Sequence, residues 1–135
     1  MVESVMPAPL SKGAVWTGRV LTGLVVVFLL FDGIIKFMMV QPVVDTFAQM
    51  GYPVKHAYLI GVIDVACAIL LAIPRTATLG AVLLTGLLGG AIATHLRIDS
   101  PLFSHTLFGV YLGIFAWIGL YLREPRLRAL LSPSA

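Results

Sequence analysis

Four apolar stretches, each close to the length of a bilayer crossing, account for most of this chain of 135 residues. They cover about residues 15–39, 56–73, 78–96 and 102–122, and most charged side chains lie at their ends or in the gaps. A membrane-spanning helix needs about 20 mostly apolar residues, because each residue advances it by about 1.5 Å. The sequence therefore predicts an all-α fold, a four-helix transmembrane bundle that forms one integral domain over residues 1–135 in the lipid bilayer.

Composition supports this prediction independently. Hydrophobic residues make up 59% of the chain and charged residues 11%, less than half the charged share of an ordinary soluble domain. Too little polar surface remains to cover a water-soluble globule. The net charge of +3 comes from basic residues scattered singly at the ends of the stretches. Because they form no basic patch with interleaved aromatic residues, we exclude a nucleic-acid partner.

The gaps between the stretches carry helix-ending signals. Prolines, which lack a backbone N–H, lie just outside the spans at Pro42, Pro53, Pro74, Pro101 and Pro125. The longest gap, residues 40–55, has apolar residues at helical spacing before Gly51, namely Val43, Val44, Phe47 and Met50. We expect a short amphipathic helix at the membrane interface here, between spans 1 and 2, with an ordinary loop as the alternative. Residues 1–11 and 124–135 are expected to be flexible tails.

Four spans place both termini on one side of the membrane, and the basic residues are distributed unequally between the two sides. The side with both termini holds Lys12, Arg19, Arg75, Arg123, Arg126 and Arg128, and the other side holds Lys36, Lys55 and Arg97. Loops rich in Lys and Arg tend to stay in the cytoplasm. We therefore expect the N- and C-termini to be cytoplasmic, in the inner (plasma) membrane of a bacterium.

Small residues recur at intervals of four in the last two spans, Gly86 with Gly90 and Gly109 with Gly113. This spacing lets membrane helices approach each other closely, although it is also frequent by chance. It favours a compact bundle in which the third span packs at the centre.

Ionisable side chains within the spans are informative because each costs about 2.5–3.5 kcal/mol in hydrocarbon and usually finds a partner inside the bundle. Asp32 and Lys36 are four residues apart on one face of the first span. Asp64 lies about two turns into the second span, and we expect it to pair across helices with Lys36, Arg97 or a histidine.

Because successive spans cross the membrane in opposite directions, these ionisable side chains come to a similar depth in the membrane. The polar side chains that fall in the outer half of the bundle are Asp32, Lys36, Asp64, His95, Arg97, Asp99 and His105. We predict a ligand-binding site there, formed by Asp32, Lys36, Asp64, His95, Arg97 and His105. The alternative is a structural Asp32–Lys36 ion pair beside a solvated loop.

Several chemistries find no support. Cys67 is the only cysteine, so the chain has no pair for a thiol–disulfide cycle, and it is expected to be a small buried apolar residue. No phosphate-binding loop, nucleophile elbow or His-Glu-x-x-His motif is present. His95, Asp99 and His105 lack a spacing that fixes a metal or a haem, so we predict no metal site.

Several motifs together resemble a known family. They are Phe-Asp-Gly-Ile-Ile-Lys-Phe at 31–37, Met-Gly-Tyr-Pro at 50–53, Gly-Val-Ile-Asp at 61–64, Pro-Arg at 74–75 and Gly-Gly-Ala-Ile-Ala-Thr-His-Leu-Arg at 89–97. The chain resembles, over nearly its whole length, the DoxX-like branch of small four-helix membrane proteins. In that family the second helix usually carries Glu where this chain has Asp64, which shortens the reach of the carboxylate by one methylene.

The resemblance implies a link to redox chemistry. DoxX relatives were named for a membrane subunit of a thiosulfate:quinone oxidoreductase, and others are associated with membrane redox or oxidative-stress complexes. It implies a possible quinone cofactor, but fold-level similarity does not establish chemistry.

Two functions from different classes remain open. In the first, the protein is a non-catalytic subunit that binds a quinone or another apolar small molecule and assists a membrane redox partner. Lys36, His95 and Arg97 would donate hydrogen bonds to the oxygens of the ligand, and Asp64 would orient them. In the second, it is a membrane-embedded enzyme that isomerises or hydrates an apolar substrate, with Asp64 and His95 as the candidate catalytic residues. A purely structural interaction protein or homo-oligomer would need no such chemistry.

Overall fold

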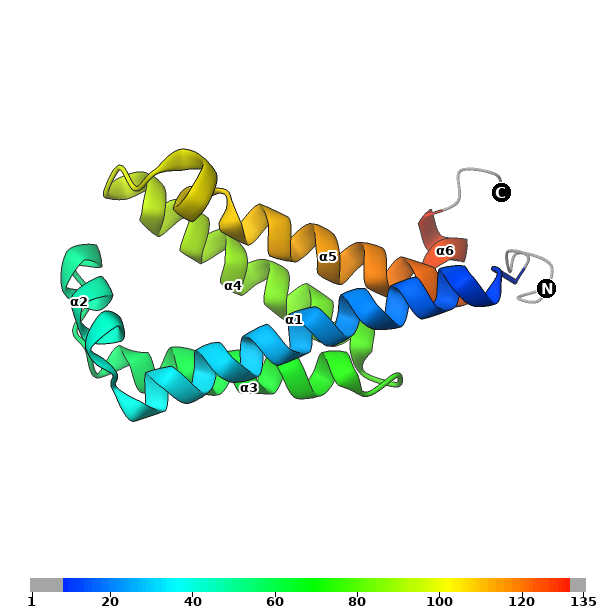
Figure 1. Ribbon diagram of the computed structural model, residues 1–135, viewed down its shortest axis with the longest axis horizontal. Helices are drawn as coiled ribbons and strands as arrows, with labels where there is room; N and C mark the ends of the chain where they lie inside the picture. Colours follow the sequence, from blue (N-terminus) through cyan, green and yellow to red (C-terminus); the bar gives the residue numbers. More distant parts are fainter. Residues whose placement is uncertain (1–8, 132–135) are drawn as a thin grey trace.

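The computed structural model describes residues 9–131 and is all-helical (Figure 1). In chain order its elements are α1 (Lys12–Met38), α2 (Gln41–Met50), α3 (His56–Ala72), α4 (Ala77–Arg97), a π-helical turn (Leu102–Thr106), α5 (Phe108–Arg123) and α6 (Pro125–Leu131). The four predicted spans match α1, α3, α4 and the π-helical turn with α5, to within three residues at each end. The prediction of an all-α bundle with four spans is confirmed.

Length and apolar character make these helices suitable for a membrane. Three of the helical segments are long and apolar enough to cross a bilayer, namely α1, α4 and the continuous stretch Leu102–Arg123. The fourth, α3, is apolar but has 17 residues, which corresponds to about 25 Å of helix and to the short end of the range for a membrane span.

The four long helices pack as a square. α1 lies against α3 and α5, and α4 lies against the same two helices, so α1 and α4 are diagonal neighbours. Figure 1 shows that the start of α1 and α6 lie at one end of the bundle, which we call the terminal end, and that α2 lies across the other end, the α2 end. The polar residues of the predicted site belong to the α2 end.

Glycines set the closest helix crossings. Gly18 of α1 meets Gly119 of α5 near the terminal end, where a Cβ on Gly18 would stand 2.8 Å from the Gly119 carbonyl oxygen. Gly33 of α1 meets Gly61 of α3 nearer the α2 end, with a corresponding distance of 3.0 Å. Because backbones approach this closely only without side chains, these glycines fix where α1 crosses its two neighbours.

The expectation that the third span packs at the centre is wrong, since α4 is one corner of the square, and of its glycines only Gly80 closely approaches a neighbouring helix. A Cβ on Gly86 or Gly90 of α4 would meet nothing within 4 Å. Gly109 of α5 does make a helix contact, since its Cβ would stand 3.0 Å from a side-chain carbon of Ile92 in α4. The spacing of four residues therefore marks a helix contact in α5, whereas in α4 it marks a surface that no other helix of the described chain covers.

A matched pair of glycines tests the crossing of α1 with α5. Gly18→Ala is expected to lower the free energy of unfolding in detergent by about 1–3 kcal/mol, because its methyl group would collide with backbone atoms that cannot rotate away. Gly23→Ala, also in α1, should have no such cost because its Cβ would meet nothing within 4 Å. Equal losses in the two variants would contradict the assigned crossing.

The predicted amphipathic helix in the first gap is α2. It ends at Gly51, which adopts the left-handed conformation with φ of 78°. Val43 and Phe47, on its apolar face, are buried against Ala57 at the start of α3. Protein therefore covers this face, and α2 closes one end of the bundle.

The C-terminal segment differs from expectation. We predicted a flexible tail over 124–135, but residues 125–131 form α6. Leu127 joins the hydrophobic core, and the buried Arg128 donates a hydrogen bond of 3.0 Å from Nη1 to the carbonyl oxygen of Tyr121. The sequence does not reveal this contact, because it depends on how the chain turns at Glu124, between α5 and α6. Of the predicted tails, residues 1–8 and 132–135 lie outside the described residues.

Candidate ligand site at the α2 end

The bundle contains a cavity of about 700 Å³ at the α2 end. Its walls come from α1, α3, α4, the π-helical turn and α5, and α2 covers it with Val43, Phe47 and Met50. Most of the lining side chains are apolar. A cavity of this size and character is typical of sites for small molecules, which usually measure about 300–1,000 Å³ and carry a few polar groups.

Five of the six residues of the predicted ligand site line this cavity: Asp32, Lys36, Asp64, His95 and His105. They come from four different segments of the chain, α1, α3, α4 and the π-helical turn. Alternating helix directions bring them to the same end of the bundle, as the order of the spans predicts.

Lys36 lies between two carboxylates. It forms an ion pair with Asp32, one turn earlier in α1, and a second with Asp64 of α3, where Nζ and Oδ2 are 3.2 Å apart. The side chains of Lys36 and Asp64 are only 12% and 3% exposed. The expectation that Asp64 pairs across helices is confirmed, with Lys36 as its partner. The Gly33–Gly61 crossing one turn away holds α1 and α3 close enough for this pair.

Asp64 retains an unused acceptor. The approach of Lys36 Nζ to Asp64 Oδ2 is not aligned as a hydrogen bond, and this buried oxygen has no hydrogen-bond partner within residues 9–131. A buried polar atom without a partner is costly, so native structures rarely keep one without a reason. Two carboxylates also share a single ammonium group, which leaves an excess of acceptor capacity at the wall of the cavity.

Two histidines form the other polar group of the cavity. The rings of His95 and His105 have centroids 5.9 Å apart and are inclined by 70°. Nδ1 of His95 lies 2.9 Å from the Ser100 hydroxyl, and Nδ1 of His105 lies 2.7 Å from the Ser104 hydroxyl. The serines thereby fix the orientation of both rings, and Nε2 is the ring nitrogen that each has left for a ligand. In the described part of the chain, no three His, Cys, Asp or Glu side chains group closely enough to hold a metal ion.

Arg97 and Asp99 occupy other positions. Arg97 is exposed and does not line the cavity. Its Nη2 donates a hydrogen bond of 3.2 Å to the Met50 carbonyl oxygen at the end of α2. The structure therefore gives Arg97 a role in tying α4 to α2. Asp99 is exposed in the turn after α4, in the left-handed conformation with φ of 53°.

Sequence reasoning missed part of the lining. Tyr52 and Thr94 both line the cavity, and their hydroxyl oxygens are 3.0 Å apart, which links the α2–α3 connection to α4. Tyr52 lies within the Met-Gly-Tyr-Pro motif, so that motif was the available signal. Thr94 adjoins His95, but the sequence contained no signal that it belongs to a site. A threonine in a membrane helix commonly donates a hydrogen bond to a backbone carbonyl of the same helix, as Thr94 also does to Gly90.

The fold and this cavity define a class, the small four-helix integral membrane proteins with apolar spans and a polar-edged internal site. The model of the DoxX-like family matches residues 20–119, a stretch that reaches into all four long helices. The chain belongs to the DoxX-like family. No curated protein and no solved structure matches it. The family membership confirms the resemblance found in the sequence motifs.

Proposed function

We propose that the protein binds an apolar molecule with an oxygen-bearing head group, of quinone or quinol chemistry, and that it serves as a non-catalytic subunit of a membrane redox system. The observation that carries this proposal is the buried Asp64 oxygen without a hydrogen bond at the wall of a 700 Å³ apolar cavity. A hydroxyl group of a quinol would satisfy that oxygen, and the apolar remainder of the molecule matches the rest of the lining.

The same polar edge suits the oxidised ligand. Lys36 has three N–H donors, and within residues 9–131 only the Asp32 carboxylate accepts a hydrogen bond from it. An N–H of Lys36 is therefore available for a carbonyl oxygen, as is an N–H of His95. The site thus offers an acceptor for a hydroxyl group and donors for a carbonyl group. Arg97, which the sequence suggested as a donor, takes no part in this arrangement.

The ligand would enter from the bilayer between α3 and α4. These helices touch near their connection, where a Cβ on Gly80 would lie 2.7 Å from the Leu71 nitrogen. Toward the α2 end, exposed residues of both helices line the cavity, among them Leu59 of α3 and Gly86 and Gly90 of α4. At a rise of about 1.5 Å per residue, Gly86 and Gly90 lie roughly 16 and 10 Å from the end of α4, within its apolar length.

A membrane-embedded enzyme is the second candidate function. The buried carboxylate of Asp64 and the imidazole of His95 line one cavity, and such a pair can transfer protons to and from an apolar substrate in isomerisation or hydration. Turnover by the purified protein without a partner, abolished by both Asp64→Asn and His95→Ala, would favour this candidate. Binding without turnover favours the accessory subunit.

Mass spectrometry of small molecules that co-purify in mild detergent tests the binding proposal. Wild-type protein should retain a quinone or a similar apolar molecule. Asp64→Asn should reduce the amount bound per protein by about tenfold or more, since a hydrogen bond to a charged group contributes about 1.5–3 kcal/mol. Asp45→Asn is the matched control, because Asp45 is exposed on α2 and does not line the cavity.

Equal retention in wild type and Asp64→Asn, or no apolar molecule in either, would overturn the proposal. A loss in both aspartate variants would also contradict it, because a general effect of removing a carboxylate would then explain the result.

A further inference from the structure

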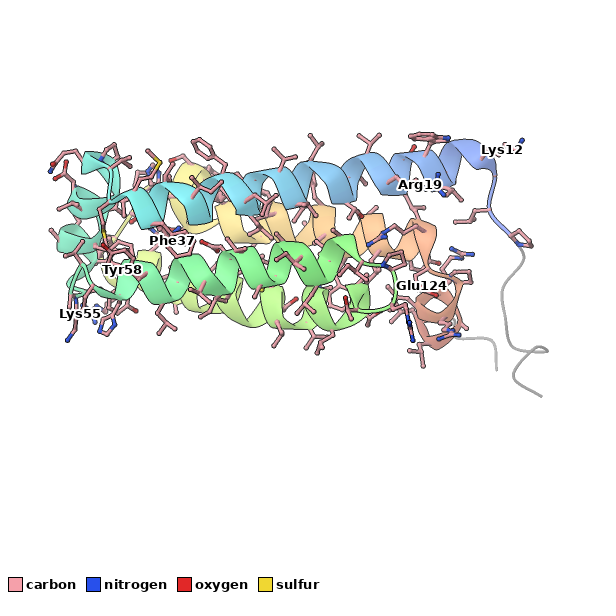
Figure 2. The ribbon with its side chains drawn as sticks, turned by 90° about the horizontal axis from the view of Figure 1, so that it is seen from below. Lys12, Arg19, Phe37, Lys55, Tyr58 and Glu124 are labelled. Carbon is pink, nitrogen blue, oxygen red and sulfur yellow. The ribbon has the colours of Figure 1, made fainter. Side chains whose placement is uncertain are left out.

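A second, smaller cavity lies at the terminal end of the bundle, away from the proposed quinone site. Its volume is about 250 Å³, and its walls come from α1, the α3–α4 connection, the start of α4 and the end of α5. The charged residues that line it are Arg19, Arg123 and Glu124. Figure 2 shows Arg19 and Glu124 at the same end of the molecule, opposite the end that holds Lys55 and Tyr58.

Arg123 is held in place with hydrogen-bonding capacity to spare. Its Nη2 donates a hydrogen bond of 2.7 Å to the carbonyl oxygen of Leu71, near the end of α3. Its Nε is buried and has no hydrogen-bond partner among residues 9–131. The bond to Leu71 fixes the planar guanidinium group beside the cavity, so a ligand there would meet an oriented donor group.

Positive charge predominates at this cavity. The Arg19 guanidinium lies over the Trp16 ring, 5.5 Å from its centroid. Within the described residues, neither Arg19 nor Arg123 forms an ion pair with a carboxylate. Glu124 accepts a hydrogen bond from the backbone N–H of Arg126 at 3.1 Å. Two arginines and one glutamate therefore line the cavity, which gives its lining an excess of one positive charge.

The start of α4 adds donors of the same kind. Ala77, its first residue, lines the cavity. Thr76 precedes the helix without a side-chain hydrogen bond to it. The first amides of a helix have no acceptors inside the helix, and the helix dipole makes this end favourable for an anion.

We propose that this cavity binds a phosphate-type anion, either the head group of an anionic phospholipid or free inorganic phosphate. A bidentate guanidinium group, a second arginine and a helix N-terminus are the donors that proteins use for tetrahedral oxyanions. The position suits a head group, because Arg19 and Arg123 sit near the terminal ends of two long apolar helices. This site is independent of the quinone proposal, since it shares no lining residue with the larger cavity.

Native mass spectrometry of the detergent-purified full chain tests the anion site. Titration with phosphatidylglycerol should give a bound lipid at lower concentration than titration with phosphatidylcholine. Arg19→Gln should weaken phosphatidylglycerol binding by about tenfold or more, because it removes a charge-assisted contact. Arg19→Lys keeps the charge and should bind more tightly than Arg19→Gln. Arg126→Gln is the control, since Arg126 is exposed and does not line the cavity.

Inorganic phosphate is titrated in parallel, with thermal unfolding as the readout. A stabilisation by phosphate that Arg19→Gln removes identifies the free anion as the ligand, and lipid binding without a phosphate effect identifies the head group. Absence of both effects overturns the proposal. Equal losses in Arg19→Gln and Arg126→Gln also overturn it, because the binding would then depend only on overall charge. Arg123→Lys provides a second variant, which keeps the charge but lacks Nε, and should also bind more weakly.

Discussion

Lys36→Met is expected to lower the free energy of unfolding by about 3–5 kcal/mol, the usual cost of leaving a buried charge without its partner. Lys36 is the cation that pairs with both Asp32 and Asp64, and Asp64 is almost completely buried. Methionine fills a similar volume, so the loss would reflect charge rather than packing. Chemical denaturation in detergent, followed by far-UV circular dichroism, measures it.

Two further variants isolate the cause. Lys55→Met removes an exposed lysine near the same end of the bundle and should change stability by less than about 0.5 kcal/mol. Adding Asp64→Asn to Lys36→Met should restore part of the lost stability, because it removes the unpaired charge. A loss below about 1 kcal/mol in Lys36→Met, or no recovery in the double variant, would show that these three side chains do not form a buried ionic group.

Gly90→Leu is expected to slow ligand binding by about tenfold or more. Gly90 is exposed, lines the large cavity and leaves open space where a side chain would project. A leucine there would occupy the proposed opening between α3 and α4. The association rate of a fluorescent quinone analogue with protein in lipid nanodiscs measures the effect, with equilibrium binding as a second readout.

Gly89→Leu is the matched control for this experiment. Gly89 adjoins Gly90 and is also exposed, and a Cβ on it would also meet nothing within 4 Å, but it does not line the cavity. Both substitutions raise helix propensity by a similar amount. Equal association rates in the two variants would place the route of access elsewhere.

The positions of the helices and of the polar cluster could be predicted from the sequence. The first follow from the apolar runs, and the second from the alternating directions of successive spans. Apolar runs bounded by prolines define where α1, α3 and α4 begin and end. Once spans alternate, Lys36, Asp64 and His95 must come to the same end. A partner for Asp64 on another helix follows as well, since an isolated charge in an apolar helix needs one, but the choice of Lys36 over Arg97 or a histidine came from the structure.

The sequence did not predict which side chains of a helix point into the cavity and which point away from it. Arg97 follows His95 by two residues, about 200° around the helix, so the two side chains point to different sides of α4. From the sequence, both residues were assigned to the same depth in the membrane. Which of them lines the cavity depends on how α4 is rotated about its axis in the bundle, and this is known only from the structure. Gly86 and Gly90 show the same limit, because the spacing that permits close packing does not specify whether a partner helix is present.

A density map of the protein, purified from its membrane in mild detergent and resolved to individual side chains, tests the central claim most directly. That claim is that the large cavity at the α2 end holds an apolar ligand by its polar head group. The account predicts non-protein density in the cavity with its polar end within hydrogen-bond distance of Asp64 or Lys36. A map in which α2 and neighbouring side chains fill that volume, or in which Asp64 faces lipid, would contradict it.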